Sequence, residues 1–229
     1  FIDEKIRVAD VTYKSIQKYK TVLNKLLEFQ IYMKRKYILS NLKEQFFIDL
    51  IIYLRDKHDL YDNTLERYIK IIKTFLRWSL KKGYSPPMAF TEIRIKKHET
   101  DDVALTREEV QLIESADLNE KKDKCRDLFL IGVYSGQRWS DYSCFDKSDL
   151  RDGVIHKRAQ KTGSISYIPL HDNLKAILDK YKWKLPKISS QKFNINIQNI
   201  CKDLKINNKI KFTHSKGNFK KEEIKEKWE

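Results

Sequence analysis

An arginine between two helical segments is the residue best placed to bind a phosphate. Arg138 follows Gly136, where one predicted helix ends, and stands directly before the start of another. A guanidinium beside a helix N-terminus presents a planar fork of donors where negative charge is already favoured. Asp141, three residues on, could cap the new helix or hold the guanidinium in place. The alternative is an ordinary surface arginine at a helix start.

A lysine in a predicted β-turn could act together with this arginine. Lys161 lies in the sequence Gln-Lys-Thr-Gly, which ends at Gly163 and separates two alternating segments. A lysine on such a turn can reach into a DNA groove and donate a proton to a leaving oxygen. Most lysines in turns are simply solvated, so Lys161 depends on its context for a role.

The sequence offers little support for a cofactor. Cys125, Cys144 and Cys201 are widely spaced, with no Cys-x-x-Cys pair and no histidine cluster, so we expect no metal and no other cofactor. An odd number of cysteines without a signal peptide favours a reducing cytoplasm. No apolar run approaches the roughly 20 residues that cross a bilayer, so no membrane partner is expected.

The charge balance indicates the class of partner. The 229 residues contain 47 Lys and Arg against 32 Asp and Glu, a net charge of +15. A polyanion is therefore the first candidate, and nucleic acid is the commonest one. The alternative is a basic protein without such a partner, or a scaffold whose basic faces meet acidic protein.

Helical periodicity dominates the first part of the chain. Thr12 is the expected N-cap of the first helix, Asp62 and Asn63 offer caps for the third, and Gly83 should end it. These helices form a predicted bundle over 1–93. The helices predicted from apolar spacing cover 12–35, 43–57 and 64–82.

A polar, aperiodic stretch, 94–102, is predicted to be a basic interdomain linker that could lie along a phosphate backbone. The second domain, 103–229, opens with a capping box formed by Thr106 and Glu109. Its predicted helices cover 106–115, 123–135, 172–181 and 189–204, and its predicted strands cover 154–156 and 165–168 with a weaker pair around Gly217. The predicted fold class is mainly α with a small antiparallel β element: a helical bundle followed by a mixed α/β domain.

Basic residues recur at helical spacing in the third predicted helix, where they form one stripe. A charged stripe is usually a solvated face, but one that touches phosphates would position a duplex without reading its sequence. The candidates for DNA contact are the stripe Arg67, Lys70, Lys73 and Arg77, together with Lys18, Lys20, Arg94, Lys96 and Lys97.

The order of these pieces resembles the tyrosine recombinases of the phage-integrase family. The bundle and basic linker are followed by Leu105-Thr-Arg-Glu-Glu109, then by Tyr134-Ser-Gly-Gln-Arg-Trp-Ser-Asp141, and then by a Gln-Lys-Thr-Gly hairpin that ends in Tyr167-Ile-Pro-Leu170. The resemblance covers most of the chain. The last segment, from Lys216-Gly-Asn to Lys-Trp-Glu229, is most similar to integrases of conjugative transposons.

The resemblance implies a SAM-like core-binding domain, a catalytic domain, and site-specific recombination or integration of a mobile element through a 3′-phosphotyrosine. By this resemblance Arg138 grips the scissile phosphate, Lys161 is the general acid for the 5′-hydroxyl leaving group, and Asp141 supports the site. The partner is double-stranded DNA in a bacterial cytoplasm. Full-length relatives work as tetramers on two DNA sites through a C-terminal helix that is not found here, so this chain could be monomeric.

Two parts of the family pattern are not found. The family has a His-x-x-Arg box followed by a nucleophilic tyrosine, but no arginine lies three residues after His214, and the last tyrosine, Tyr181, comes too early. We therefore expect a truncated catalytic domain, incomplete at its C-terminus, which binds DNA but lacks the nucleophile. The alternatives are a non-catalytic DNA-binding regulator or a decayed recombinase, and a basic protein-interaction scaffold.

Overall fold

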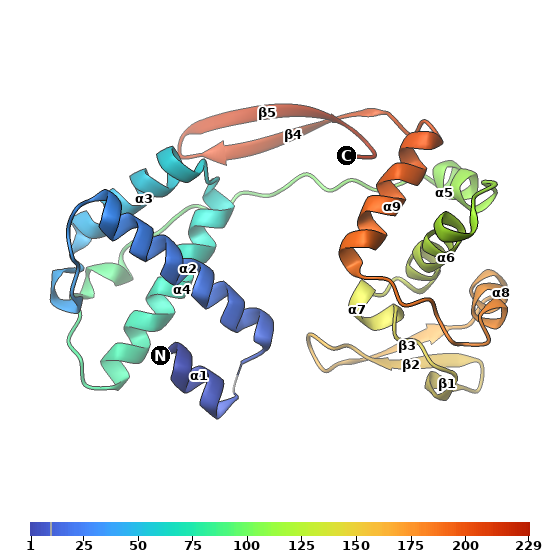
Figure 1. The fold of residues 1–229 in the computed structure, drawn as a ribbon, viewed down its shortest axis with the longest axis horizontal. Helices are drawn as coiled ribbons and strands as arrows, with labels where there is room; N and C mark the ends of the chain where they lie inside the picture. Colours follow the sequence, from blue (N-terminus) through green and yellow to red (C-terminus); the bar gives the residue numbers. More distant parts are fainter. Residues whose placement is uncertain (10) are drawn as a thin grey trace. The chain divides into compact units, whose positions relative to one another are not determined.

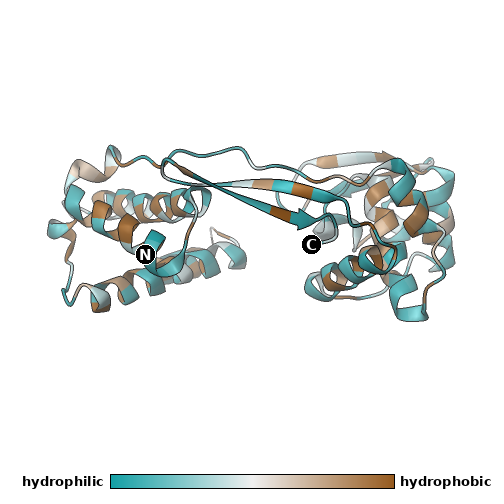
Figure 2. Cartoon of the chain, turned by 90° about the horizontal axis from the view of Figure 1, so that it is seen from above, coloured by the Kyte–Doolittle hydropathy of each residue, from teal (hydrophilic) through white to brown (hydrophobic). Residues whose placement is uncertain are grey.

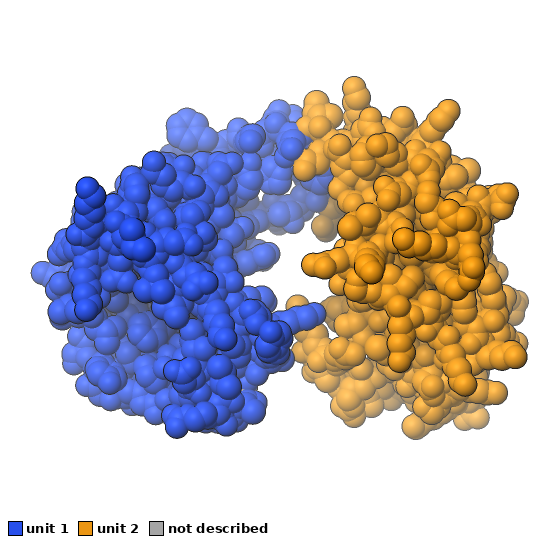
Figure 3. Space-filling view, in the orientation of Figure 1, with its two compact units in different colours: residues 1–101, 211–223 blue, residues 102–210, 224–229 orange. Residues whose placement is uncertain are grey.

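The chain divides into two compact units in a computed structural model that describes residues 1–9 and 11–229. The first unit combines Phe1–Asp101 with Lys211–Glu223, and the second combines Asp102–Ile210 with Ile224–Glu229 (Figure 3). The sequence predicted one continuous second domain over 103–229. The structure differs because the tip of a late hairpin packs with the first unit.

The first unit is built from helices (Figure 1). Thr12 caps α2 as predicted, since its hydroxyl accepts the Ser15 N–H at 3.3 Å. The predicted capping role of Asp62 and Asn63 is wrong: α4 follows Tyr61 without a side-chain cap, and both side chains bond to distant segments instead. The helices are α1 (Ile2–Val8), α2 (Tyr13–Tyr32), α3 (Glu44–His58) and α4 (Asp62–Lys81), with single 3-10 turns at Leu39–Asn41 and Met88–Thr91.

A single apolar cluster forms the core of the first unit. Phe29, Phe47, Leu50 and Leu65 are fully buried in it, and each such side chain contributes roughly 1.5–3 kcal/mol. In Figure 2 the apolar residues of these helices are concentrated where the helices face one another. This is the expected result of the three- and four-residue spacing in the sequence.

The second unit combines helices with a small antiparallel sheet (Figure 1). The sheet has the order β1-β2-β3, and the predicted hairpin is confirmed by the pairing of Ile155 with Ile168, both of which are buried. The capping box of Thr106 and Glu109 is also present. The elements are α5 (Arg107–Glu114), α6 (Glu120–Ser135), α7 (Trp139–Tyr142), β1 (Leu150–Arg151), a 3-10 turn at Lys147–Asp149, β2 (Val154–Arg158), β3 (Ile165–Pro169), α8 (Asp172–Lys180) and α9 (Ser190–Asp203).

A second hairpin follows α9. Strands β4 (Lys209–Lys216) and β5 (Phe219–Glu226) form a two-stranded sheet, which matches the weak strand pair predicted around Gly217. Gly217 has a φ of +66°, in the left-handed region where glycine is favoured. The tip of this β4–β5 hairpin belongs to the first unit, and the base of the hairpin belongs to the second unit.

Helix α6 lies between the two apolar clusters of the second unit. Leu128 and Ile131 join one cluster, while Cys125 joins the other. Near its end, a Cβ at Gly132 would meet the ring of Tyr142 at 2.8 Å, so glycine lets α7 approach closely. The position of α7 is therefore set by packing against a buried helix. The overall result confirms a mainly helical fold with small antiparallel sheets.

Candidate active site

Arg138 is the residue that links α6 to α7. Helix α6 ends at Gly136 with a left-handed φ of +63°, and Arg138 then has extended backbone and an exposed side chain. Helix α7 has a single turn, so its dipole contributes little. The sequence argument from a helix N-terminus is therefore weakened. What the structure shows is an exposed arginine side chain at the corner between α6 and α7.

Asp141 is fully buried one turn after Arg138. Its Oδ1 accepts the backbone N–H of Gln160 at 2.9 Å and the hydroxyl of Ser140 at 3.2 Å. Its Oδ2 has no hydrogen-bond partner within residues 1–9 and 11–229. Neither role suggested by the sequence is seen, because α7 has no side-chain cap and, in the described part of the chain, the carboxylate bonds to Gln160 and Ser140 rather than to Arg138. The carboxylate instead anchors the turn of the β2–β3 hairpin.

Lys161 follows the anchored Gln160 in that turn. Backbone bonds of 2.8 Å from Ala159 to Ser164 and from Gly163 to Ala159 close the turn, and Gly163 takes a φ of +73°. The Lys161 side chain is exposed. Through Asp141, the structure joins the segment that carries Arg138 to the turn that carries Lys161. Gln160 was missed, since a contact through its backbone has no signal in the sequence.

The end of α6 is held by a tyrosine of the same motif. Tyr134 donates its hydroxyl to Glu114 at 2.7 Å and accepts from Asn173 at 3.2 Å. Burial and the Glu114 carboxylate raise the pKa of this hydroxyl. The ring of His171 packs edge-on against Tyr134 at 4.9 Å. His171 therefore contributes packing at the start of α8.

Two tyrosines of the second unit are poorly suited to attack a phosphate. Tyr181 donates its hydroxyl to Asp127 at 2.8 Å, and burial and that carboxylate raise its pKa strongly. Tyr142 lies in the core, where burial raises its pKa as well. The thermodynamic difficulty of forming either phenolate argues against a nucleophilic role. His214 lies in the first unit, where it stacks on Tyr61 at 4.7 Å.

The basic stripe of α4 divides into exposed and structural members. Arg67, Lys70 and Arg77 are exposed. Lys73 is partly buried and donates to the backbone carbonyls of Thr91, at 3.2 Å, and of Ile93. Burial and neighbouring arginines lower the pKa of Lys73. Three members are thus free to meet a phosphate, while Lys73 holds the segment after α4 in place.

The remaining candidates for DNA contact are also exposed. On the segment after the bundle, Ile93 and Ile95 pack against the first core and alternate with outward-facing basic residues. This part of the predicted linker is therefore attached to the first unit. The outward-facing candidates are Arg94, Lys96 and Lys97 there, and Lys18 and Lys20 on α2.

A lysine-rich hollow of about 710 Å³ lies in the second unit. Its acidic residue, Glu120, is paired with Lys124 at 2.6 Å, which lowers the pKa of Glu120. The sequence did not indicate this surface because its members come from α6, the α8–α9 loop and α9. Its lysines are Lys121, Lys124, Lys184, Lys187 and Lys192.

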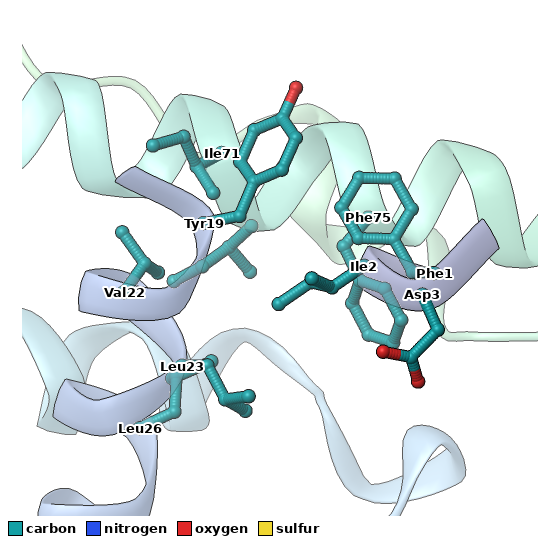
Figure 4. A pocket seen from close by; sticks show the side chains of 10 residues that line it. Phe1, Ile2, Asp3, Tyr19, Val22, Leu23, Leu26, Ile71 and Phe75 are labelled. Atoms are coloured by element: carbon teal, nitrogen blue, oxygen red, sulfur yellow. The ribbon is translucent and has the colours of Figure 1, made fainter. Parts of the chain in front are cut away.

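An apolar hollow of about 290 Å³ lies between α1, α2 and α4 in the first unit. Figure 4 shows side chains such as Ile2, Val22 and Leu23 lining it, with Asp3 as its charged residue. This mainly apolar lining, with its one carboxylate, does not suit a phosphate. A search of the described residues finds no group of three His, Cys, Asp or Glu side chains that could hold a metal, and no helix among them has the length and apolar character to span a membrane.

The first unit matches a known domain family over residues 1–97. They match the family model of the phage integrase SAM-like domain. No match to a curated protein was found by sequence comparison. The SAM-like domain accounts for the helical bundle and for the segment that carries Arg94, Lys96 and Lys97.

Solved structures resemble the SAM-like domain together with the second unit. A lambda integrase dimer bound to a COC′ core site has a TM-score of 0.70 at 18% identity, over 88% of this chain and 76% of that one. A lambda integrase tetramer bound to a Holliday junction has a TM-score of 0.72 at 17% identity, over 89% of this chain and 61% of that one. The XerH site-specific recombinase bound to a palindromic difH substrate has a TM-score of 0.63 at 15% identity, over 83% and 63%. The chain shares its fold with these integrases and this recombinase, which confirms the fold class that the resemblance implied.

Proposed function

We propose that this chain is the DNA-binding and phosphate-gripping part of a tyrosine-type site-specific recombinase of a mobile element. The observation that carries the proposal is that Asp141, three residues after Arg138, binds the backbone of the turn that holds Lys161, in a chain whose residues 1–97 match the phage integrase SAM-like domain. The exposed basic residues of that domain, with the segment 94–102, would hold the duplex backbone. The core-binding role belongs to 1–93 and the catalytic role to the second unit.

The chemistry follows from the charges that develop on the phosphate. A tyrosine hydroxyl attacks the phosphorus, the bond to the 5′ oxygen breaks, and a 3′-phosphotyrosine remains. Arg138 stabilises the charge on the non-bridging oxygens more in the transition state than in the ground state. Lys161 gives a proton to the departing 5′ oxygen. Asp141 keeps the Lys161 turn in one place, which preserves the alignment that the step needs.

The attacking tyrosine is not proposed to be any of the buried ones. Tyr181 is the last tyrosine in the sequence, and its hydroxyl is committed to Asp127. These 229 residues would therefore bind DNA without cutting it, and a nucleophile would have to be supplied by additional chain. We further propose that such a full-length protein is related to the integrases of conjugative transposons and works as a tetramer on two DNA sites.

A salt titration of duplex binding tests the DNA partner. Phosphate contacts predict a linear fall of log K with log salt concentration. A protein-interaction scaffold predicts no affinity for duplex DNA even at low salt. Absence of binding at low salt would therefore overturn the proposal.

The chemical roles need a protein that also carries a nucleophilic tyrosine, obtained by extending the chain with the coding sequence that follows. On a nicked duplex this protein should form a covalent adduct. Arg138→Ala should slow its formation by about 10²–10³-fold. Arg151→Ala, an exposed arginine on β1, is the matched control and should slow it far less. An adduct that forms at the same rate without Arg138 would refute the assigned role.

Lys161 can be tested by changing the leaving group. Lys161→Ala should slow cleavage of an ordinary phosphodiester by about 10²–10⁴-fold, the range of general acid catalysis. A substrate with sulfur at the 5′ bridging position should restore most of the rate, because a thiolate leaves without a proton. Equal slowing on both substrates would mean that Lys161 is not the acid.

A further inference from the structure

The tip of the β4–β5 hairpin is part of the first unit although the strands come more than a hundred residues after it. The backbone N–H of Gly217 donates to both carboxylate oxygens of Asp62, at 3.0 and 2.9 Å. Asp62 is the first residue of α4, and its side chain is 3% exposed. The turn of the hairpin thus ends on a buried carboxylate of the SAM-like domain.

The Asp62 carboxylate, together with the groups that bind it, is called the seat of the hairpin tip. Arg55 donates to it at 2.8 Å, and His98 lies 3.3 Å away. A buried carboxylate is stable only where cations and hydrogen bonds satisfy it, and the Gly217 N–H supplies one of these bonds. A Cβ at Gly217 would make ordinary contact with the Arg55 guanidinium at 3.4 Å, so the φ of +66° rather than lack of space favours glycine here.

The contacts around the seat are polar. Lys216 pairs with Asp59 at 2.8 Å, and this ammonium lowers the pKa of Asp59. The Thr213 N–H donates to Asp101 at 3.1 Å, and Phe219 at the start of β5 remains 82% exposed. Apart from the stacking of His214 on Tyr61, little apolar surface is buried here. Contacts of this kind open at a low free energy compared with a packed core.

The same corner of α4 also holds the segment that leads to the second unit. Asn63 donates to the His98 carbonyl and accepts its N–H, both at 2.9 Å. Asp62 and Asn63 therefore hold the hairpin tip and residue 98 at one place. The chain passes from one unit to the other after Asp101, and twice more through the two strands of the hairpin.

We propose that the β4–β5 tip is a reversible latch, seated on Asp62 of the SAM-like domain, that slows the release of duplex DNA. The inference rests on the proposed DNA-binding function. A seated tip adds a second connection between the units to the one that follows Asp101. Each connection raises the effective concentration of one unit for a duplex still held by the other, so DNA must leave both before it escapes.

A charge swap on the intact chain tests the latch. Asp59→Lys and Lys216→Glu each place like charges where the ion pair stands, and the double variant restores an opposite pair. Each single variant should raise hydrogen exchange of the Gly217 amide by about two- to fivefold, as expected for an exposed pair. The double variant should return it toward the original rate. Lys220→Glu, exposed on the same hairpin but outside these contacts, is the control and should leave it unchanged.

The rate of DNA release separates a latch from bulk charge. Asp59→Lys raises the net charge by two and Lys216→Glu lowers it by two, so general electrostatics predicts opposite effects on binding. A latch predicts that both single variants speed release about two- to fivefold and that the double variant restores it. Asp62→Asn, which removes the charge of the seat, should also speed release.

Each result of these experiments either supports the latch or overturns it. Slower release in Asp59→Lys, or Gly217 exchange unaffected by either single variant, would overturn the latch. Exchange at Gly217 only through global unfolding would show a permanent part of the domain and would also overturn it. An original chain that fails to bind duplex at low salt would refute the proposed function itself, and retention with it, whatever the exchange experiment shows.

Discussion

Two buried aspartates, one in each unit, hold the turn of a hairpin by accepting a backbone N–H. Asp62 binds Gly217, and Asp141 binds Gln160. They differ in what else surrounds the carboxylate. Arg55 compensates the charge of Asp62, and the His98 ring lies 3.3 Å from it without a hydrogen bond, whereas Asp141 has hydroxyl and amide donors and one oxygen without a hydrogen bond in the described chain.

We call the Asp62 carboxylate a complete anchor because both of its oxygens accept hydrogen bonds. The Asp141 carboxylate is an incomplete anchor because only one of its oxygens does. Burial of a carboxylate is strongly unfavourable unless a cation or several donors satisfy it. Asp62 meets that condition within the first unit. Asp141 meets it only in part, beside the exposed residues Arg138 and Lys161.

The largest effect is expected at the complete anchor. Asp62→Ala leaves the Arg55 charge and the Gly217 N–H without their acceptor, so the free energy of unfolding of the first unit should fall by about 3 kcal/mol. The free energy of unfolding is measured by urea titration, with hydrogen exchange of the α3 and α4 amides as the readout. Asp59→Ala, which removes an exposed carboxylate, should change it by less than about 0.5 kcal/mol. Equal effects of the two variants would mean that the buried position of Asp62 is unimportant.

A smaller effect is expected at the incomplete anchor. Asp141→Ala removes one acceptor from Gln160, whose side chain is exposed and whose amide can turn to water, so stability should fall by about 1–2 kcal/mol. Exchange of the Gln160 amide should rise in the same variant. Asp141→Asn keeps an acceptor oxygen and should protect that amide. If Asp141→Ala destabilised its unit as much as Asp62→Ala does the other, the proposed contrast would fail.

A partly buried carboxylate, Glu109, extends the comparison to the effect of pH. Burial alone would raise the pKa of Glu109, but Lys227 at 2.6 Å and the Thr106 N–H lower it below its ordinary value. A depressed folded pKa gives stability that is present above the unfolded pKa, near 4.5, and is lost as the pH falls through the lower folded value. Glu109→Gln should therefore reduce the stability of the second unit by about 1 kcal/mol at neutral pH. The difference between variant and original chain should shrink below pH 4.5, and a constant difference would contradict this ion pair.

The smallest effect concerns the stripe on α4. Lys70 is exposed and Lys73 is bonded to backbone carbonyls. Lys70→Ala should lower the slope of log K against log salt by about 1 without changing stability. Lys73→Ala should leave that slope unchanged and reduce stability by about 1 kcal/mol. A reversed result would assign DNA contact to Lys73.

Much of the fold could be predicted because its signals are local. The apolar spacing in α2, α3 and α4 and the capping box at Thr106 depend on residues within a few positions of each other. Helix α1 was missed because its seven residues show too little periodicity. The expected caps at Asp62 and Asn63 were wrong because tertiary partners took their side chains.

By itself, the sequence determined the helical bundle, the two hairpins and the residue types at Arg138, Asp141 and Lys161, since these follow from short-range periodicity and motif order. Only the tertiary structure decided what Asp141 holds, which members of the basic stripe are free, and which unit receives the hairpin tip at Gly217. The physical reason is that a buried carboxylate takes whichever donors the fold brings to it. For Asp62 and Asp141 those donors include backbone N–H groups, which every residue except proline carries, so no pattern of side chains indicates these two contacts.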